Sequence, residues 1–119
     1  MGTNTVLFGW SRSNPGREHL SGQHFEEFVK YLNGRKEAKA IDDYEIVFLD
    51  AHGGDLGGFF LIKAESARLD TFLSTAEWIT HMTRATMHLE NVGIIRGVTG
   101  VRVAERMALW SGLIPQISE

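Results

Sequence analysis

Two apolar runs decide the fold of this 119-residue chain, Tyr44-Glu-Ile-Val-Phe-Leu-Asp-Ala51 and Gly58-Phe-Phe-Leu-Ile-Lys-Ala64. Both are short and rich in β-branched and aromatic side chains, so each predicts a β-strand. Between them lies His52-Gly-Gly-Asp-Leu-Gly57, whose glycines supply the positive φ torsions that a hairpin loop needs. We therefore expect the two strands to pair antiparallel.

Both faces of these strands carry apolar side chains. In the first run Tyr44, Ile46 and Phe48 share one face, whereas Val47 and Leu49 share the other. The second run, and a further run at residues 92–99, repeat this pattern. An antiparallel sheet with one face in water alternates apolar with polar residues. We therefore expect both faces of this sheet to be covered.

The rest of the chain adds one strand before this pair, one strand after it, and several helices. Alternation predicts the first strand at residues 5–12 and the last at 92–99. Helical spacing predicts helices at about residues 17–39, 66–73 and 74–89, and a final helix that contains Val103 and Ile114; Ser74 and Glu77 have the spacing of a capping box. This order predicts one α+β domain over residues 1–119. Its arrangement is ferredoxin-like βαββαβ, with a four-stranded antiparallel sheet and an additional C-terminal helix.

Two crossover helices cover only one face of a four-stranded sheet. The simplest cover for the other face is a second copy of the chain, so we expect a homodimer that forms through the sheet face. The alternative is that the C-terminal helix folds back over this face within one chain.

Composition excludes several classes of function. With 12 Lys plus Arg against 15 Asp plus Glu, the net charge is -3, so no overall basic field attracts nucleic acid. The absence of cysteine excludes disulfides and thiolate metal sites. No segment is long and apolar enough to span a membrane, and the first residues lack a signal-peptide pattern. We expect a cytoplasmic protein that has no metal or cofactor and contacts neither nucleic acid nor membrane.

The element order and the doubly apolar strands resemble the dimeric α/β-barrel superfamily over about residues 4–99. This resemblance implies two ferredoxin-like protomers packed sheet to sheet. Residues 49–59 (Leu-Asp-Ala-His-Gly-Gly-Asp-Leu-Gly-Gly-Phe) and 77–81 (Glu-Trp-Ile-Thr-His) are similar to segments of small uncharacterised bacterial members. The superfamily contains cofactor-independent monooxygenases, lactone isomerases, haem-using enzymes and ligand-sensing domains, so the resemblance selects no activity.

Histidines are the strongest candidates for chemistry. His81 and His88 are seven residues apart, hence about 20° apart around a helix axis, on the edge of the apolar stripe that begins at Trp78. His24 has the corresponding position beside the stripe of the first helix. In ligand-binding members of the superfamily the pocket lies between sheet and helices, where these edges would point. Such histidines transfer protons or polarise a ligand, or they are half-buried structural residues bonded to backbone and water.

Four further residues complete the candidate ligand pocket, and one of them is Trp78, at the start of the stripe beside His81. Trp10 lies on the first strand, and Arg96 lies near the middle of the last, where a buried guanidinium would need an anionic or carbonyl partner. His52 follows a strand beside the glycine-rich turn, with Asp50 on the same face. No nucleophile motif accompanies this pair, which favours a structural hairpin.

Three functions remain compatible with the sequence. The first is a homodimeric protein that binds a small apolar or aromatic molecule between sheet and helices. The second is a cofactor-independent monooxygenase or isomerase that acts on an aromatic or polyketide-like substrate. The third is a structural or protein-interaction module. The residues do not identify a catalytic group, so whether the protein is an enzyme stays open.

Overall fold

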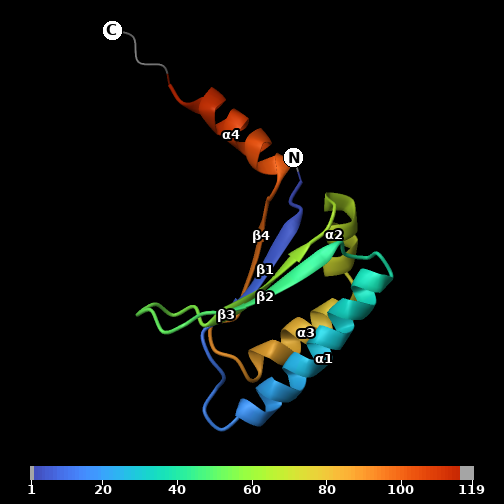
Figure 1. Cartoon of the computed structure of the whole chain (residues 1–119), viewed down its shortest axis with the longest axis vertical. Coiled ribbons are helices and arrows are strands. Elements are labelled where there is room, and N and C mark those ends of the chain that lie inside the picture. The colour runs from blue at the N-terminus through green and yellow to red at the C-terminus, as the bar shows by residue number, and fades with distance from the viewer. Residues whose placement is uncertain (1, 116–119) are drawn as a thin grey trace.

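One antiparallel sheet of four strands forms the centre of the molecule, and its strand order is β2-β3-β1-β4 (Figure 1). The computed structural model describes residues 2–115. Along the chain the elements are β1 (Thr5–Trp10), α1 (Glu18–Glu37), β2 (Asp43–Phe48), β3 (Gly58–Lys63), α2 (Ser66–Leu73), α3 (Ala76–Thr86), β4 (Gly93–Gly97) and α4 (Val101–Leu113). The prediction of an α+β, ferredoxin-like fold with an additional C-terminal helix is confirmed.

The predicted hairpin of residues 44–64 is present. β2 pairs antiparallel with β3, and β1 pairs antiparallel with both β3 and β4. The hairpin loop contacts the end of β1 at Gly57, whose N–H donates to the Trp10 carbonyl oxygen at 2.8 Å. A Cβ at Gly57 would lie 2.0 Å from the carbonyl oxygen of Ser11, so only glycine allows this approach.

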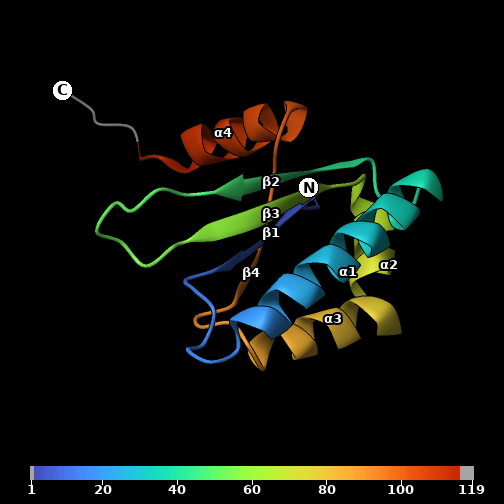
Figure 2. The same cartoon turned by 60° about the horizontal axis from the view of Figure 1, so that its bottom comes forward.

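Helices α1 and α3 lie side by side and cover one face of the sheet (Figure 2). The strand residues that point toward them alternate along the chain, as a pleated strand requires, and Phe60 of β3 is only 2% exposed. The core that forms between the two layers consists of Val6, Phe8, Phe28, Leu32, Ile41, Phe60, Ile62, Ala64, Leu69, Phe72, Trp78, Met82 and Ala85. The helical stripe predicted around Trp78 and Met82 therefore faces the sheet.

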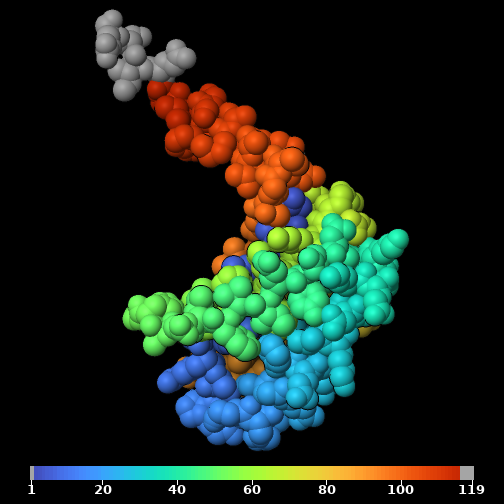
Figure 3. Space-filling view, in the orientation of Figure 1, coloured from blue at the N-terminus to red at the C-terminus, as the bar shows by residue number. Residues whose placement is uncertain are grey.

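No helix within residues 2–115 covers the opposite face of the sheet. Leu7 lies between Leu61 and Ile95 on this face, and the Ile95 side chain is 61% exposed. The C-terminal helix does not fold back over the sheet, because α4 contains no buried residue and extends away from the body of the molecule (Figures 1 and 3). Met107 and Trp110 of this helix are each more than half exposed.

The start and the end of α3 differ from the prediction. The N-cap is Thr75, whose hydroxyl accepts from the Trp78 N–H at 3.4 Å, instead of Ser74. Ser74 is the C-cap residue of α2, and its hydroxyl donates to the Asp70 carbonyl oxygen at 2.7 Å. The helix ends at Thr86, three residues before the predicted Leu89. No helix within residues 2–115 has the length and apolarity needed to cross a bilayer.

Candidate functional site

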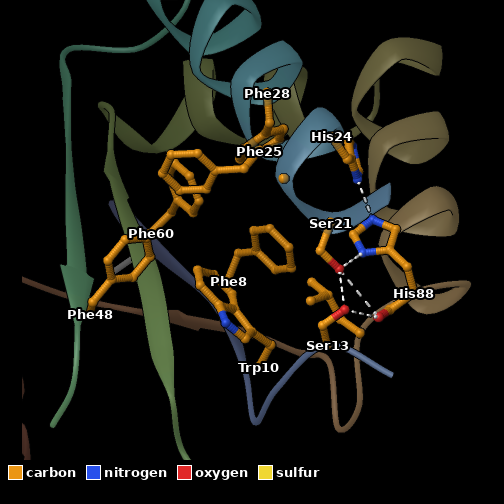
Figure 4. A pocket seen from close by; sticks show the side chains of 12 residues that line it. Phe8, Trp10, Ser13, Ser21, His24, Phe25, Phe28, Phe48, Phe60 and His88 are labelled. Carbon is orange, nitrogen blue, oxygen red and sulfur yellow. Dashed lines mark hydrogen bonds between the residues drawn. The ribbon is translucent and has the colours of Figure 1, made fainter. Parts of the chain in front are cut away.

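A pocket of about 370 Å³ lies between the helix-facing side of the sheet, α1 and the turn that follows α3 (Figure 4). Three strands, one helix and two connecting segments contribute to its wall. The lining residues are Phe8, Trp10, Ser13, Ser21, Gly22, His24, Phe25, Phe28, Phe48, Phe60, His88 and Leu89. None of them carries a permanent charge.

Aromatic rings form most of the wall. Phe8 stacks on Phe60 with ring centroids 5.9 Å apart, and Phe28 meets Phe60 edge to face at 4.9 Å. Trp10 contacts Phe48 edge to face at 6.4 Å. The Phe48 side chain is 66% exposed, which places it at the rim where the pocket opens to solvent. The wall therefore suits a flat apolar molecule.

Hydroxyl and imidazole groups line the remaining edge of the pocket. The Ser13 and Ser21 Oγ atoms are 2.6 Å apart, and Ser21 Oγ lies 2.8 Å from His88 Nδ1. Figure 4 shows these groups on the side opposite Phe48 and Phe60. The hydroxyl and imidazole groups of the wall are thus gathered at one end of the pocket.

Three histidines form a continuous hydrogen-bonded chain behind this edge. His24 Nδ1 lies 2.8 Å from His88 Nε2, and His24 Nε2 lies 3.0 Å from His81 Nδ1. The His24 and His81 rings stack with centroids 5.2 Å apart and an interplanar angle of 9°. His24 on α1 therefore bridges the two histidines that the sequence placed along one helix.

Backbone pairing holds the polar edge in place. His88 lies beyond the end of α3, and its carbonyl oxygen accepts from the Asn14 N–H at 2.8 Å. Ser13 forms an isolated antiparallel bridge with Leu89. The segment after β1 and the segment before β4 thus run together, which brings the Ser13 hydroxyl to the backbone carbonyl oxygen of His88 at 3.4 Å and to the Ser21 hydroxyl.

Burial keeps the three imidazoles neutral near pH 7. Desolvation, together with the smaller effects of the Arg84 cation and the other two histidines, lowers the pKa of His24 to about 4. Burial and Arg84 also lower the pKa values of His81 and His88 from the usual value. A neutral imidazole has one N–H donor and one acceptor nitrogen. Each ring in the chain can therefore donate on one side and accept on the other.

This arrangement does not resemble a metal centre. Both ring nitrogens of His24 are directed at other histidines, so they do not converge on a common point. Within residues 2–115, no group of three or more His, Asp or Glu side chains is placed to hold a metal ion.

The predicted site residues fall into two groups. Trp10, His24 and His88 line the pocket, and His81 joins them through His24. Trp78 lies outside the pocket in the hydrophobic core, where it is 4% exposed.

Arg96 and His52 also lie outside the pocket. The guanidinium of Arg96 pairs with Asp70 and donates to the Thr3 hydroxyl at 2.9 Å, so its anionic partner belongs to the protein. His52 is exposed, and its ring organises the hairpin loop because Nε2 contacts the Leu56 carbonyl oxygen at 2.7 Å. These contacts agree with the structural interpretation of the His52 turn.

Sequence reasoning missed the two serines. Ser21 precedes His24 by three residues on α1, which places both on one helix face. This spacing is a usable signal, but it is weak because serine is common on exposed helix surfaces. Ser13 carries no local signal, since its position depends on the pairing of segments about 75 residues apart.

Comparison with known proteins gives a fold but no activity. No protein-family model matches the chain, and no curated protein matches it. The crystal structure of PA3566 from Pseudomonas aeruginosa is similar, with a TM-score of 0.53 and 19% sequence identity over 84% of this chain and 97% of that one. At this identity the likeness shows the shared ferredoxin-like architecture alone.

Proposed function

We propose that the protein binds a small, neutral, largely aromatic molecule in the pocket between the sheet and α1. The observation that carries this proposal is the distribution of polarity around the pocket. Aromatic side chains form the walls, and hydroxyl and imidazole groups occur only at the edge formed by Ser13, Ser21, His24 and His88. Small-molecule sites are commonly apolar with a few convergent polar groups that set orientation.

Size and charge narrow the ligand class. A volume of about 370 Å³ lies near the lower end of the usual range for ligand pockets, which suits a molecule of one or two rings. Among the residues that the structure describes, no Lys, Arg, Asp or Glu lines the pocket, so an ionic ligand would lose hydration without gaining a counter-charge. An uncharged ring system with an oxygen at one end matches both features.

A substitution at Gly22 tests the proposal. Gly22 lines the pocket, and a Cβ added there meets no atom within 4 Å, so Gly22→Trp should narrow the pocket while the fold is kept. Gly34 lies on the same helix with equally open surroundings but away from the pocket, so Gly34→Trp is the matched control. We expect 2-naphthol to bind the native protein and the control alike, and to bind Gly22→Trp about tenfold or more weakly by calorimetry. The proposal fails if the native protein does not bind neutral aromatic compounds, or if the two variants bind equally well.

A cofactor-independent monooxygenase or isomerase that acts on an aromatic or polyketide-like substrate is the second candidate. The specific observation in its favour is the hydrogen-bonded chain of His88, His24 and His81 beside an apolar pocket. Such chemistry needs proton-transfer groups next to a substrate held away from water. Turnover of a bound hydroxylated aromatic compound, followed with and without oxygen, distinguishes catalysis from binding alone.

We also propose that a second copy of the chain covers the open face of the sheet. Leu7, Leu61 and Ile95 form an apolar row across three strands there, and α4 adds further exposed apolar side chains. A self-complementary face of this kind suits a two-fold dimer, because the same surface then covers itself. The mass in solution, measured by light scattering, tests this proposal.

A further inference from the structure

The chain of serines and histidines admits two complete arrangements of its protons. In the first, His81 Nδ1 donates to His24 Nε2, His24 Nδ1 donates to His88 Nε2, and His88 Nδ1 donates to Ser21 Oγ. In the second, each of these donors becomes an acceptor, and donation runs from Ser21 to His81. Both arrangements satisfy every bond with neutral rings, because each imidazole has one donor and one acceptor nitrogen.

The two ends of this chain lie in different environments. Ser13 and Ser21 line the pocket, whereas His81 does not line it and is only partly buried. His24, in the middle, is 3% exposed and has no polar partner among the described residues other than histidines. The chain therefore leads from the pocket, through the buried layer, to the surface.

We infer that Ser13, Ser21, His88, His24 and His81 form a two-way proton path between the pocket and solvent. The inference rests on the proposed function in one respect: the molecule bound in the pocket is the group that gives or takes the proton. The path itself follows from an unbroken series of contacts of 2.6, 2.8, 2.8 and 3.0 Å. Each of these contacts is within ordinary hydrogen-bond distance.

One proton moves inward by five linked transfers that follow its entry from water. His81 Nε2 takes a proton from solvent, and its Nδ1 proton passes to His24 Nε2. The Nδ1 proton of His24 passes to His88 Nε2, and the Nδ1 proton of His88 passes to Ser21 Oγ. The original hydroxyl proton of Ser21 passes to Ser13, and that of Ser13 passes to an oxygen of the bound molecule. Every ring ends neutral in its other tautomer, and the reverse sequence releases a proton.

The charged groups near the path favour transfer over storage of a proton. Arg84 lies one helical turn after His81 and pairs with Glu27 of α1 at 2.5 Å. Arg17 lies near the other end, where it donates to the Met87 carbonyl oxygen at 2.5 Å. The Tyr31 ring packs on His81 with centroids 4.5 Å apart. Burial and the two cations disfavour a lasting imidazolium and outweigh the opposing Glu27 carboxylate, so the path relays a proton without retaining its charge.

The path specifies the reactive end of the ligand. In one arrangement Ser13 offers a proton to the pocket, and in the other it accepts one. The matching group both gains and loses a proton at oxygen, as a phenol or an enol hydroxyl and its carbonyl form do. We therefore expect a hydroxylated or keto-enol aromatic compound, with that oxygen beside Ser13.

Two charged substitutions at residue 81 test the path without a ligand. The ammonium group introduced by His81→Lys can only donate to His24 Nε2, which should force Nδ1–H on both His24 and His88. The carboxylate introduced by His81→Glu can only accept, which should force Nε2–H on both. Nitrogen NMR at about pH 8, where the rings are neutral, reads the tautomer of His88, which lies two contacts from residue 81.

We expect the His88 tautomer ratio to differ about tenfold or more between these two variants, with His81→Gln, which can donate or accept, in between. The same His88 tautomer in the Lys and Glu variants would overturn the proton path.

A pair of probes tests transmission in the native protein. 2-Naphthol should change the tautomer ratio of His81, which it does not touch, whereas 2-methylnaphthalene, which lacks the oxygen, should bind without this effect. If both compounds bind and neither changes His81, the path is wrong and the proposed binding function stands. If neither compound binds, the binding proposal fails, and the Lys and Glu variants still decide the path.

Discussion

The two faces of the sheet are built from alternate residues of the same strands, yet their side chains differ in how far they are exposed to solvent. Phe60 faces α1 and is 2% exposed, whereas its neighbour Phe59 faces away and is only partly buried. Both are apolar, so hydrophobicity does not separate them. The difference is that α1 and α3 cover one face within the chain, while the other has no cover among the described residues (Figure 2). An apolar pattern therefore indicates that a face of the sheet is buried. It does not indicate whether the same chain or a second chain covers that face.

The largest expected effect comes from truncating one side chain on each face. Phe60→Ala should lower the free energy of unfolding by about 3–5 kcal/mol, because it opens a cavity in the aromatic core. Phe59→Ala should lower it by less than about 1 kcal/mol when the protein is dilute enough to be monomeric. Chemical denaturation at two protein concentrations measures both. Equal losses in dilute solution would contradict the contrast between the faces.

A smaller effect is expected from protonation of His24, which lies in the covered layer. Its pKa in the folded protein is lowered to about 4 from a usual value of 6.5. The unfolded chain therefore takes up this proton first, and protonation favours unfolding. Stability should be unaffected by this group above pH 6.5 and should fall by as much as about 3 kcal/mol as the pH drops to 4.

Denaturation across this pH range in His24→Gln measures that contribution. The variant should lose much of the acid sensitivity, because glutamine keeps polar contacts but does not titrate. His19→Gln is the matched control, since His19 is an exposed histidine on the same helix. If the stability of His24→Gln depended on pH in the same way as that of the native protein, burial would not lower the pKa of His24.

The smallest expected effect concerns the open face. Ile95→Lys places a charge in the apolar row beside Leu7, and it should weaken self-association about tenfold or more, a change of about 1.4 kcal/mol. Ile94→Lys, on the same strand but facing the helix side, should not change the mass. Light scattering at micromolar concentration measures both. A native protein with the mass of one chain would contradict the proposed dimer.

Much of the fold was predictable because its signals are local. The short runs of β-branched and aromatic residues at 44–48 and 58–63 and the apolar stripe of α3 are local patterns that favour a strand and a helix. The error at the start of α3 arose because Ser74 and Thr75 are both good N-cap residues. Ser74 instead bonds back to α2, and that competition depends on where the preceding helix ends.

The candidate site was predictable only in part. Helical spacing placed His24, His81 and His88 at the edges of apolar stripes. It did not show that His24 lies between the other two, or that the serines extend the series to the pocket. Spacing alone also gave Trp78 a place in the site, although its ring packs in the core.

Local order and apolar periodicity are properties of short segments, so the residues themselves establish the strands, the helices and the presence of two apolar faces. The hydrogen bonds that link Ser21, His24, His81 and His88 join residues that are 57 to 67 apart in the chain. Directional bonds of about 3 Å form only after packing has set the position and rotation of each element. For this reason the pairing of ring nitrogens and hydroxyls, and the route from pocket to surface, emerged only from the folded arrangement.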